Sequence, residues 1–428
     1  DINIMPNTVK DLLQDIFGID FSKLGSEELV KEKFFAHNFS FDDLRKVHEF
    51  VANSSVRIDD NDIPGAFLIP SDPARRTSEL PFAIVSQVHG NEPAGLTGIA
   101  LAMALSEAGY LNRPVYSVIG NPLAAKQYFE ALRISPDAPE EARDKYRAGV
   151  DESNRLLKDM NRVPGNFLEL DPSDPHTKRA QELWTMSANY SGVLDIHTAR
   201  GELTCITDHR DDQHLRYSPI RDVLDGLLEA IAGHTSTKPL KLVLDARANI
   251  KSMTGIEAGR HEDPKSFRVA AEFTLSMLYN LGITSVTPVM ERDEGTFTHF
   301  KVGEKLTFAD LAKKPTSIPF DNDLFYTVKS CNKAEDLPAG TEEVIVQGND
   351  GRLSVKPISE FVLGQDKLIY AVYQYAELEK VSKDQVVAVG VPSGTELSSP
   401  KEFNLLFITK SSKHMMILLG IPFCNPCC

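Results

Sequence analysis

The feature that most constrains the fold is an alternation of short apolar runs with longer helical stretches between residues 65 and 285. Apolar runs with the length and composition of strands lie at 65–70, 81–88, 114–120, 191–197 and 240–246. Between them, helical stretches are predicted at 94–109, 176–190 and 266–282. Pro93 and Gly109 are well placed to open and to end the first of these helices. Strands and helices alternating in this way predict an α/β sheet covered by helices on both faces.

The segments on either side of this region have a different character. Amphipathic stretches at 9–17, 26–35 and 41–51, with Ser26 and Ser40 as N-caps, make residues 1–55 a helical N-terminal extension. The α/β domain then covers 56–287, and short strands with turns predict a smaller β-rich domain at 288–400. Residues 401–428 form a tail of uncertain role, whose apolar stretches are strands, a sticky peptide or residues foreign to the domain.

Charge and cysteine content restrict the partners. A formal net charge of −15 argues against nucleic-acid binding, which needs clustered Lys and Arg, so an anionic substrate would require a local arginine site. Five cysteines, three of them within the last five residues, do not form a disulfide framework, and a cytoplasmic location fits them best. No apolar run reaches the length of a membrane span, so no membrane partner is expected. The oligomeric state is not indicated.

Two segments carry candidate metal ligands. His89 and Glu92 stand between a predicted strand and a predicted helix, where open α/β sheets place ligands. His197 ends another predicted strand, with Asp195 two residues earlier. Two histidines and one carboxylate are the protein ligands of many catalytic zinc sites. The alternatives are a polar turn, since roughly one H-x-x-E pair is expected by chance at average composition, and a hydrogen-bonded histidine at a strand end.

Further polar residues complete a candidate site. Glu257 lies in an apolar segment with a glycine on each side, where desolvation could tune a carboxylate for base catalysis. Its alternative is a helix-capping or salt-bridged glutamate. Asn161 with Arg162, and Arg247, are candidates to clamp a substrate carboxylate, although each arginine taken singly is better explained as the salt-bridge partner of a surface acid.

Five motifs in order resemble the succinylglutamate desuccinylase and aspartoacylase family, a branch of the zinc carboxypeptidase-like hydrolases. They are "VHGNEPAG", "GNPLA", "DMNRVPG", "DIHTA" and "GIEAG", and the resemblance covers roughly residues 80 to 285. It implies a zinc-carboxypeptidase-like mixed sheet with helices on both faces, followed by a smaller β-rich domain. The helical extension and the cysteine-rich tail are not typical of the family.

The resemblance assigns roles to positions that match the motifs. His89, Glu92 and His197 match the ligands of one Zn²⁺ per chain, and Glu257 matches the glutamate that activates the water. Substrate-binding positions are matched by Asn161 and Arg162, and suggested for Arg247. The family's carbonyl-polarising arginine falls on Asn154 here, so either Arg155 replaces it through a one-residue gap or another group stabilises the oxyanion.

The expected function is zinc-dependent hydrolysis of the amide bond of an N-acyl amino acid or a similar small anionic amide. The alternatives are a metallocarboxypeptidase acting on peptides, a non-haem iron oxygenase, which also uses two histidines and a carboxylate, and a non-catalytic zinc-binding relative. The acyl group and the amine are not indicated.

Overall fold

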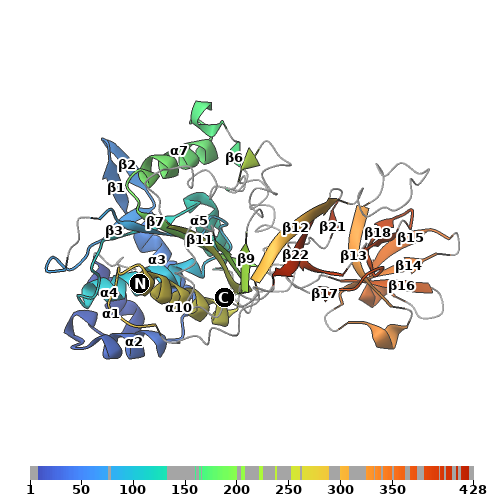
Figure 1. The fold of residues 1–428 in the computed structure, drawn as a ribbon, viewed down its shortest axis with the longest axis horizontal. Helices are drawn as coiled ribbons and strands as arrows, with labels where there is room; N and C mark the ends of the chain where they lie inside the picture. Colours follow the sequence, from blue (N-terminus) through green and yellow to red (C-terminus); the bar gives the residue numbers. More distant parts are fainter. Residues whose placement is uncertain are drawn as a thin grey trace. The chain divides into compact units, whose positions relative to one another are not determined.

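The chain forms two compact units, Asp1–Thr298 and His299–Cys428. The structure is a computed structural model (Figure 1). It describes residues 8–75, 79–132, 160, 163–164, 166–199, 204–207, 221–224, 237–238, 252–260, 263–288, 299–307, 324–331, 333–338, 341–348, 351–361, 367–373, 380–394, 396–399, 402–406, 411–412 and 416–423.

The first unit contains a mixed sheet whose strands follow the order β9-β8-β11-β7-β4-β5-β3. The strands β11, β7, β4 and β5 run parallel to one another, while β3 and β8 are antiparallel to their neighbours β5 and β11. Their bounds are β3 Ala66–Ile69, β4 Phe82–Ser86, β5 Val115–Ile119, β7 Gly192–Ala199, β8 Thr204–Thr207, β9 Arg221–Leu224 and β11 Ser252–Arg260.

Alternate residues of the central strands enter two different cores. In β4, Phe82 and Ile84 pack into one hydrophobic cluster, and Ala83 and Val85 into the other. Successive side chains of a strand point to opposite faces, so both faces of the sheet are covered. Helices α4 (Gly95–Glu107), α5 (Pro122–Leu132) and α10 (Pro264–Asn280) contribute to the first core, and α7 (Pro175–Ser187) to the second (Figure 1).

The N-terminal segment folds as the three helices expected from its sequence. They are α1 (Val9–Phe17), α2 (Glu27–Phe35) and α3 (Phe41–Ala52), with a short helix η1 (Phe21–Lys23) between the first two. Ser26 and Ser40 are the N-caps of α2 and α3, as predicted, and Ser40 forms a capping box with Asp43. Buried residues of all three helices share the core of α4, which attaches these helices to one face of the sheet.

The helix α4 follows its predicted limits closely. It begins at Gly95, after a turn in which the Leu96 amide donates to the Pro93 carbonyl. Gly109, at φ +76°, follows its last turn, in the left-handed conformation that favours glycine. The remaining small elements of this unit are the hairpin β1 (Ser55–Ile58) with β2 (Asn61–Pro64), the pair β6 (Val163–Pro164) with β10 (Thr237–Lys238), and η3 (Phe167–Glu169).

The second unit is rich in β-strands, as the sequence predicts, and its strand pairs are antiparallel. One sheet follows the order β15-β14-β16-β13-β18-β19, with β21 (Ser411–Ser412) paired to β13. Its strands are β13 Leu324–Ser330, β14 Glu343–Gln347, β15 Leu353–Pro357, β16 Lys367–Val372, β18 Val386–Val391 and β19 Glu396–Ser398. Short helices lie at Ala334–Asp336 and Ile358–Glu360.

Further antiparallel pairs of this unit join β12 (His299–Thr307) to β22 (Met416–Phe423), β22 to β20 (Phe403–Leu406), and β20 to β17 (Lys380–Val381). Among the described residues, three stretches of the predicted tail are therefore strands, β20, β21 and β22, and the tail's three cysteines lie outside the described residues. The predicted fold class is confirmed: a mixed sheet with helices on both faces, followed by a β-rich unit.

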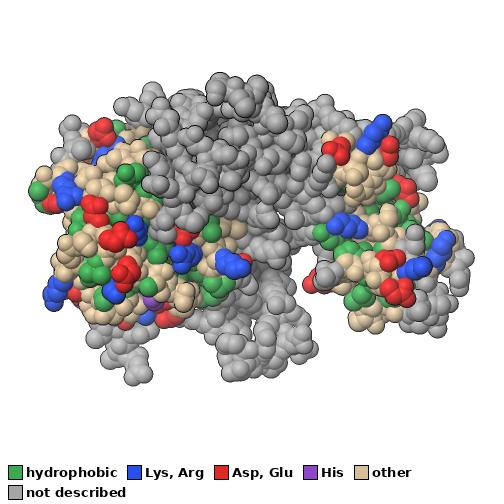
Figure 2. Space-filling view, turned by 60° about the horizontal axis from the view of Figure 1, so that its bottom comes forward, with side chains coloured by type: hydrophobic (Ala, Val, Ile, Leu, Met, Phe, Trp, Pro, Cys, Tyr) green, Lys and Arg blue, Asp and Glu red, His purple; other side chains and the backbone are tan. Residues whose placement is uncertain are grey.

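On the face shown in Figure 2, acidic and basic side chains of the described residues are interspersed with apolar ones. None of the helices in the described part of the chain combines the length and the apolar composition needed to cross a bilayer.

Candidate metal centre

The turn between β4 and α4 positions His89 and Glu92. The Glu92 amide donates to the His89 carbonyl over 3.1 Å, so the two side chains leave the same tight turn. Nδ1 of His89 lies 2.9 Å from Oε1 of Glu92. The Glu92 side chain is buried, at 7% exposure, whereas His89 is 31% exposed and remains accessible from solvent.

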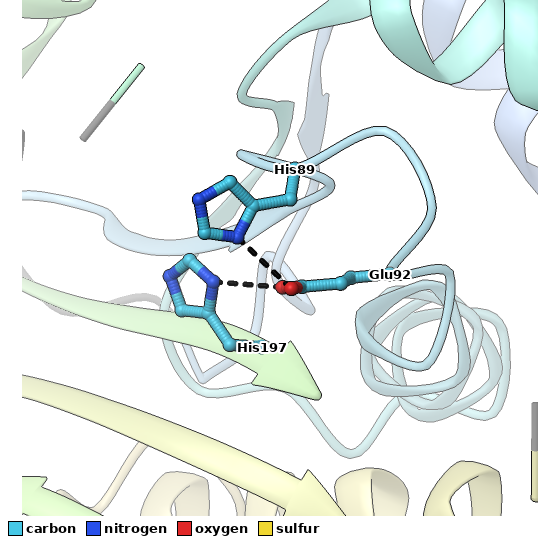
Figure 3. Close-up of side chains that lie close together, drawn as sticks. All are labelled: His89, Glu92 and His197. Carbon is cyan, nitrogen blue, oxygen red and sulfur yellow. Dashed lines mark hydrogen bonds and ion pairs between the residues drawn. The ribbon is translucent and has the colours of Figure 1, made fainter. Parts of the chain in front are cut away.

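His197 reaches the same carboxylate from strand β7. Its Nδ1 lies 2.9 Å from Oε2 of Glu92, and the Thr198 amide donates to this oxygen over 3.3 Å. Figure 3 shows both imidazole rings directed at the Glu92 carboxylate. One ligand atom from each of His89, Glu92 and His197 can be chosen so that all lie within 4.8 Å of one another. Strands β4 and β7 are parallel neighbours, so their carboxyl ends meet at one edge of the sheet.

Asp195 holds the other side of the His197 ring. Its Oδ2 lies 2.9 Å from Nε2 of His197, and Asp195 is 5% exposed. With a metal ion bound, a proton kept on Nε2 and directed at this carboxylate would leave the Nδ1 lone pair on the Glu92 side for the ion. Histidine ligands of metals commonly direct their second nitrogen at a carboxylate in this way.

The electrostatics of the cluster favour an ionised carboxylate. Burial by itself would raise the pKa of Glu92, but His89 and His197 outweigh it and hold that pKa well below its usual range. Burial by itself would lower the pKa of His197, because it disfavours the charged ring. The carboxylates of Asp195 and Glu92 outweigh this effect and raise the pKa of His197 well above its usual range. Glu92 is thus an anionic ligand at neutral pH, as metal binding requires.

The donor set fits a zinc ion. Two imidazole nitrogens and one carboxylate oxygen are the ligands of catalytic zinc sites that leave a fourth position for water. Ligand atoms each about 2.0–2.2 Å from a common ion cannot be more than about 4.4 Å apart. The two Nδ1-to-carboxylate distances of 2.9 Å lie within this limit, and the ligand atoms of all three residues lie within 4.8 Å of one another.

Glu257 lies in β11, the strand next to β7. The parallel register pairs Glu257 with His197, so the two side chains leave the same face of adjacent strands. Strands in a sheet are about 4.8 Å apart, which places Glu257 beside the histidine–carboxylate cluster. Gly259 follows at φ +120°, and a Cβ there would lie 2.7 Å from Oγ of Ser266, so this position requires glycine. The register shifts after Glu257, at the end of the strand.

The structure therefore brings together four of the residues singled out in the sequence: His89, Glu92, His197 and Glu257. The remaining candidates, Arg155, Asn161, Arg162 and Arg247, lie outside the described residues.

Two contacts at the site had no role in the sequence analysis. The sequence identifies Asp195 only as a neighbour of His197, although residues two apart in a strand share a face, which is a usable signal. Gln87, which contacts His48 on α3, carries no such signal, because the two residues are 39 positions apart.

Comparison with known proteins gives no match to a protein-family model or to a curated protein sequence. The fold is similar to solved structures of the succinylglutamate desuccinylase/aspartoacylase family across most of the chain. A member from Rhodobacter sphaeroides is 14% identical, with a TM-score of 0.45, over 85% of this chain and 90% of that one. The product-bound ectoine utilization protein EutE (DoeB) of Ruegeria pomeroyi is 13% identical, with a TM-score of 0.48, over 86% and 93% of the two chains. The succinylglutamate desuccinylase of Chromobacterium violaceum is 19% identical, with a TM-score of 0.37, over 69% and 89%. These similarities concern the path of the chain and assign no activity to it.

Proposed function

We propose that this protein is a zinc-dependent hydrolase that cleaves the amide bond of an N-acyl amino acid or a similar small anionic amide. The observation that carries the proposal is that the ligand atoms of His89, Glu92 and His197 lie within 4.8 Å of one another. On the neighbouring strand β11, Glu257 is paired in register with His197 of β7. One Zn²⁺ per chain would be held by the first three residues.

When bound, zinc lowers the pKa of a water ligand to about 7 and polarises the scissile carbonyl. The protein supplies the base. Glu257 accepts a proton from the attacking water and delivers it to the nitrogen of the leaving amine, so its carboxylate ends each cycle unprotonated. The half-buried position of Glu257 keeps it partly desolvated, which favours a base that works near neutral pH.

The substrate-binding part of the proposal rests on the sequence motifs. Asn161 and Arg162 are proposed to hold a substrate carboxylate, with Arg247 as a further cation, because a guanidinium matches a carboxylate through two parallel hydrogen bonds. Arg155 is proposed to polarise the carbonyl in place of the arginine that the family motif has at position 154. On a chain of net charge −15, these cations would be the local attraction for an anionic substrate.

The test is zinc quantification followed by a hydrolysis screen over N-succinyl, N-acetyl and related acyl amino acids. We expect one zinc per chain and turnover that falls by about 10²–10⁴-fold in Glu257→Gln, with zinc content unchanged. Glu130→Gln, a change at an exposed glutamate of α5, is the matched control and should keep full activity. Unchanged activity of Glu257→Gln would refute the assignment of the base.

The alternative functions are separated by the same measurements. Preferential cleavage of short peptides would identify a metallocarboxypeptidase, and iron in place of zinc would point to an oxygenase. Bound zinc without hydrolysis of any amide in the screen would identify a non-catalytic relative.

A further inference from the structure

A buried polar contact links the N-terminal helices to the turn that carries His89 and Glu92. His48, on α3, is 3% exposed, and its Nδ1 lies 2.9 Å from Oε1 of Gln87, which is fully buried. The side-chain nitrogen Nε2 of Gln87 donates to the Gly90 carbonyl over 3.2 Å. Because that nitrogen is used on Gly90, the Gln87 oxygen faces His48, and His48 is the donor of the first hydrogen bond.

Gln87 has an unusual backbone conformation. Its φ is +55°, in the left-handed region that residues with a Cβ rarely occupy, so the surrounding contacts must hold it there. Its backbone carbonyl accepts a hydrogen bond from the backbone amide of Asn121 over 2.9 Å. In its side chain, Oε1 is hydrogen-bonded to His48 and Nε2 to the Gly90 carbonyl. The contact with His48 is thus one of three hydrogen bonds that fix this residue.

The rest of the turn leaves little freedom. A Cβ at Gly90 would lie 2.4 Å from the carbonyl carbon of Ala124 in α5, so the backbone at Gly90 is pressed against that helix. A change in the orientation of the Gln87 side chain releases the Gly90 carbonyl and therefore shifts the backbone of the neighbouring His89. Because the Glu92 amide donates to the His89 carbonyl over 3.1 Å, Glu92 shifts with it.

We propose that His48 is a positioning residue through which the N-terminal helices set the geometry of the metal-binding turn 87–92, by way of Gln87. The inference rests on the proposed function, because it concerns the ligands of the same metal. It gives the N-terminal helices, which the family motifs do not include, a role in forming the site.

The chemistry of His48 supports a donor role. Burial lowers the pKa of His48 to about 4, so the ring is neutral at neutral pH and carries one N–H, which Gln87 accepts. The ring also packs against Phe129 of α5, with centroids 5.0 Å apart, which fixes its plane. An apolar side chain here would fill the space and leave the buried Gln87 oxygen without its donor.

The experiment compares zinc affinity among full-length variants. His48→Leu keeps a side chain of similar size and removes the donor. His48→Asn retains a nitrogen donor on Cγ, as in the histidine ring. Val47→Ala, at a fully buried apolar position of the same helix, is the matched control for lost packing. Zinc dissociation constants are measured by competition with a chromogenic chelator, and the visible spectrum of the Co²⁺ form reports the ligand geometry.

We expect His48→Leu to bind zinc about tenfold to a hundredfold more weakly and to alter the Co²⁺ spectrum, as changes behind metal ligands do. His48→Asn should restore most of the affinity, and Val47→Ala should bind as the wild type does. Equal affinity of His48→Leu and Val47→Ala, with wild-type zinc binding intact, would overturn the positioning role and leave the proposed function standing. Failure of the wild type to bind zinc or Co²⁺ would overturn both.

Discussion

The buried His48 ring should make the stability of the first unit depend on pH. Burial lowers the pKa of His48 from 6.5 to about 4, against the weaker opposing effects of the hydrogen bond to Gln87 and the Glu49 carboxylate. The folded pKa lies below the unfolded one, so the unfolded chain binds more protons between these two values. The contribution of His48 to stability is therefore fully present above the unfolded pKa and is lost as the pH falls.

The magnitude follows from the two pKa values. With a folded pKa of about 4 and an unfolded pKa of 6.5, lowering the pH from 7 to 5 removes about 2 kcal/mol of unfolding free energy through this one histidine. The asparagine of His48→Asn does not titrate in this range. Between pH 7 and pH 5 the variant should therefore lose about 2 kcal/mol less unfolding free energy than the wild type loses.

The assay is urea denaturation of both proteins at pH 7 and pH 5, followed by tryptophan fluorescence. The chain has a single tryptophan, Trp184, which lies in α7 and packs against Phe167, so its emission reports the first unit alone. Taking the difference between wild type and variant cancels the titration of the other groups. An identical pH dependence of the two proteins would refute the reasoning, since it would mean that His48 titrates alike in the folded and unfolded states.

Three further changes test other parts of the site and its support. Asp195→Asn replaces the carboxylate that contacts Nε2 of His197 with a neutral amide. Zinc affinity, measured by chelator competition, should fall about tenfold to a hundredfold. Unchanged affinity would exclude a role for that charge. Gly90→Ala places a Cβ 2.4 Å from the backbone of Ala124, and thermal or urea unfolding should show a loss of about 1–3 kcal/mol; full wild-type stability would mean that this contact is looser than the structure has it. Ser40→Ala removes the capping box of α3 and should cost about 1 kcal/mol in the same assay, with zinc content as the readout that ought not to change.

Local sequence patterns determined much of the first unit. The limits of α1 and α3, the caps Ser26 and Ser40, and the strand β4 follow from periodicity and capping chemistry, which act over a few residues. The candidate ligands could also be found, because strand ends in an α/β pattern are where polar residues gather at one edge of a sheet.

The sequence by itself named His89, Glu92, His197 and Glu257 as candidates, but their meeting depended on strand order. Only the tertiary structure places β11 beside β7 in a register that aligns Glu257 with His197, two residues separated by sixty positions of chain. It alone joins His48 to Gln87 across 39 positions. Such pairings arise from the packing of a whole core, in which many weak contacts select one arrangement, and no local pattern encodes them.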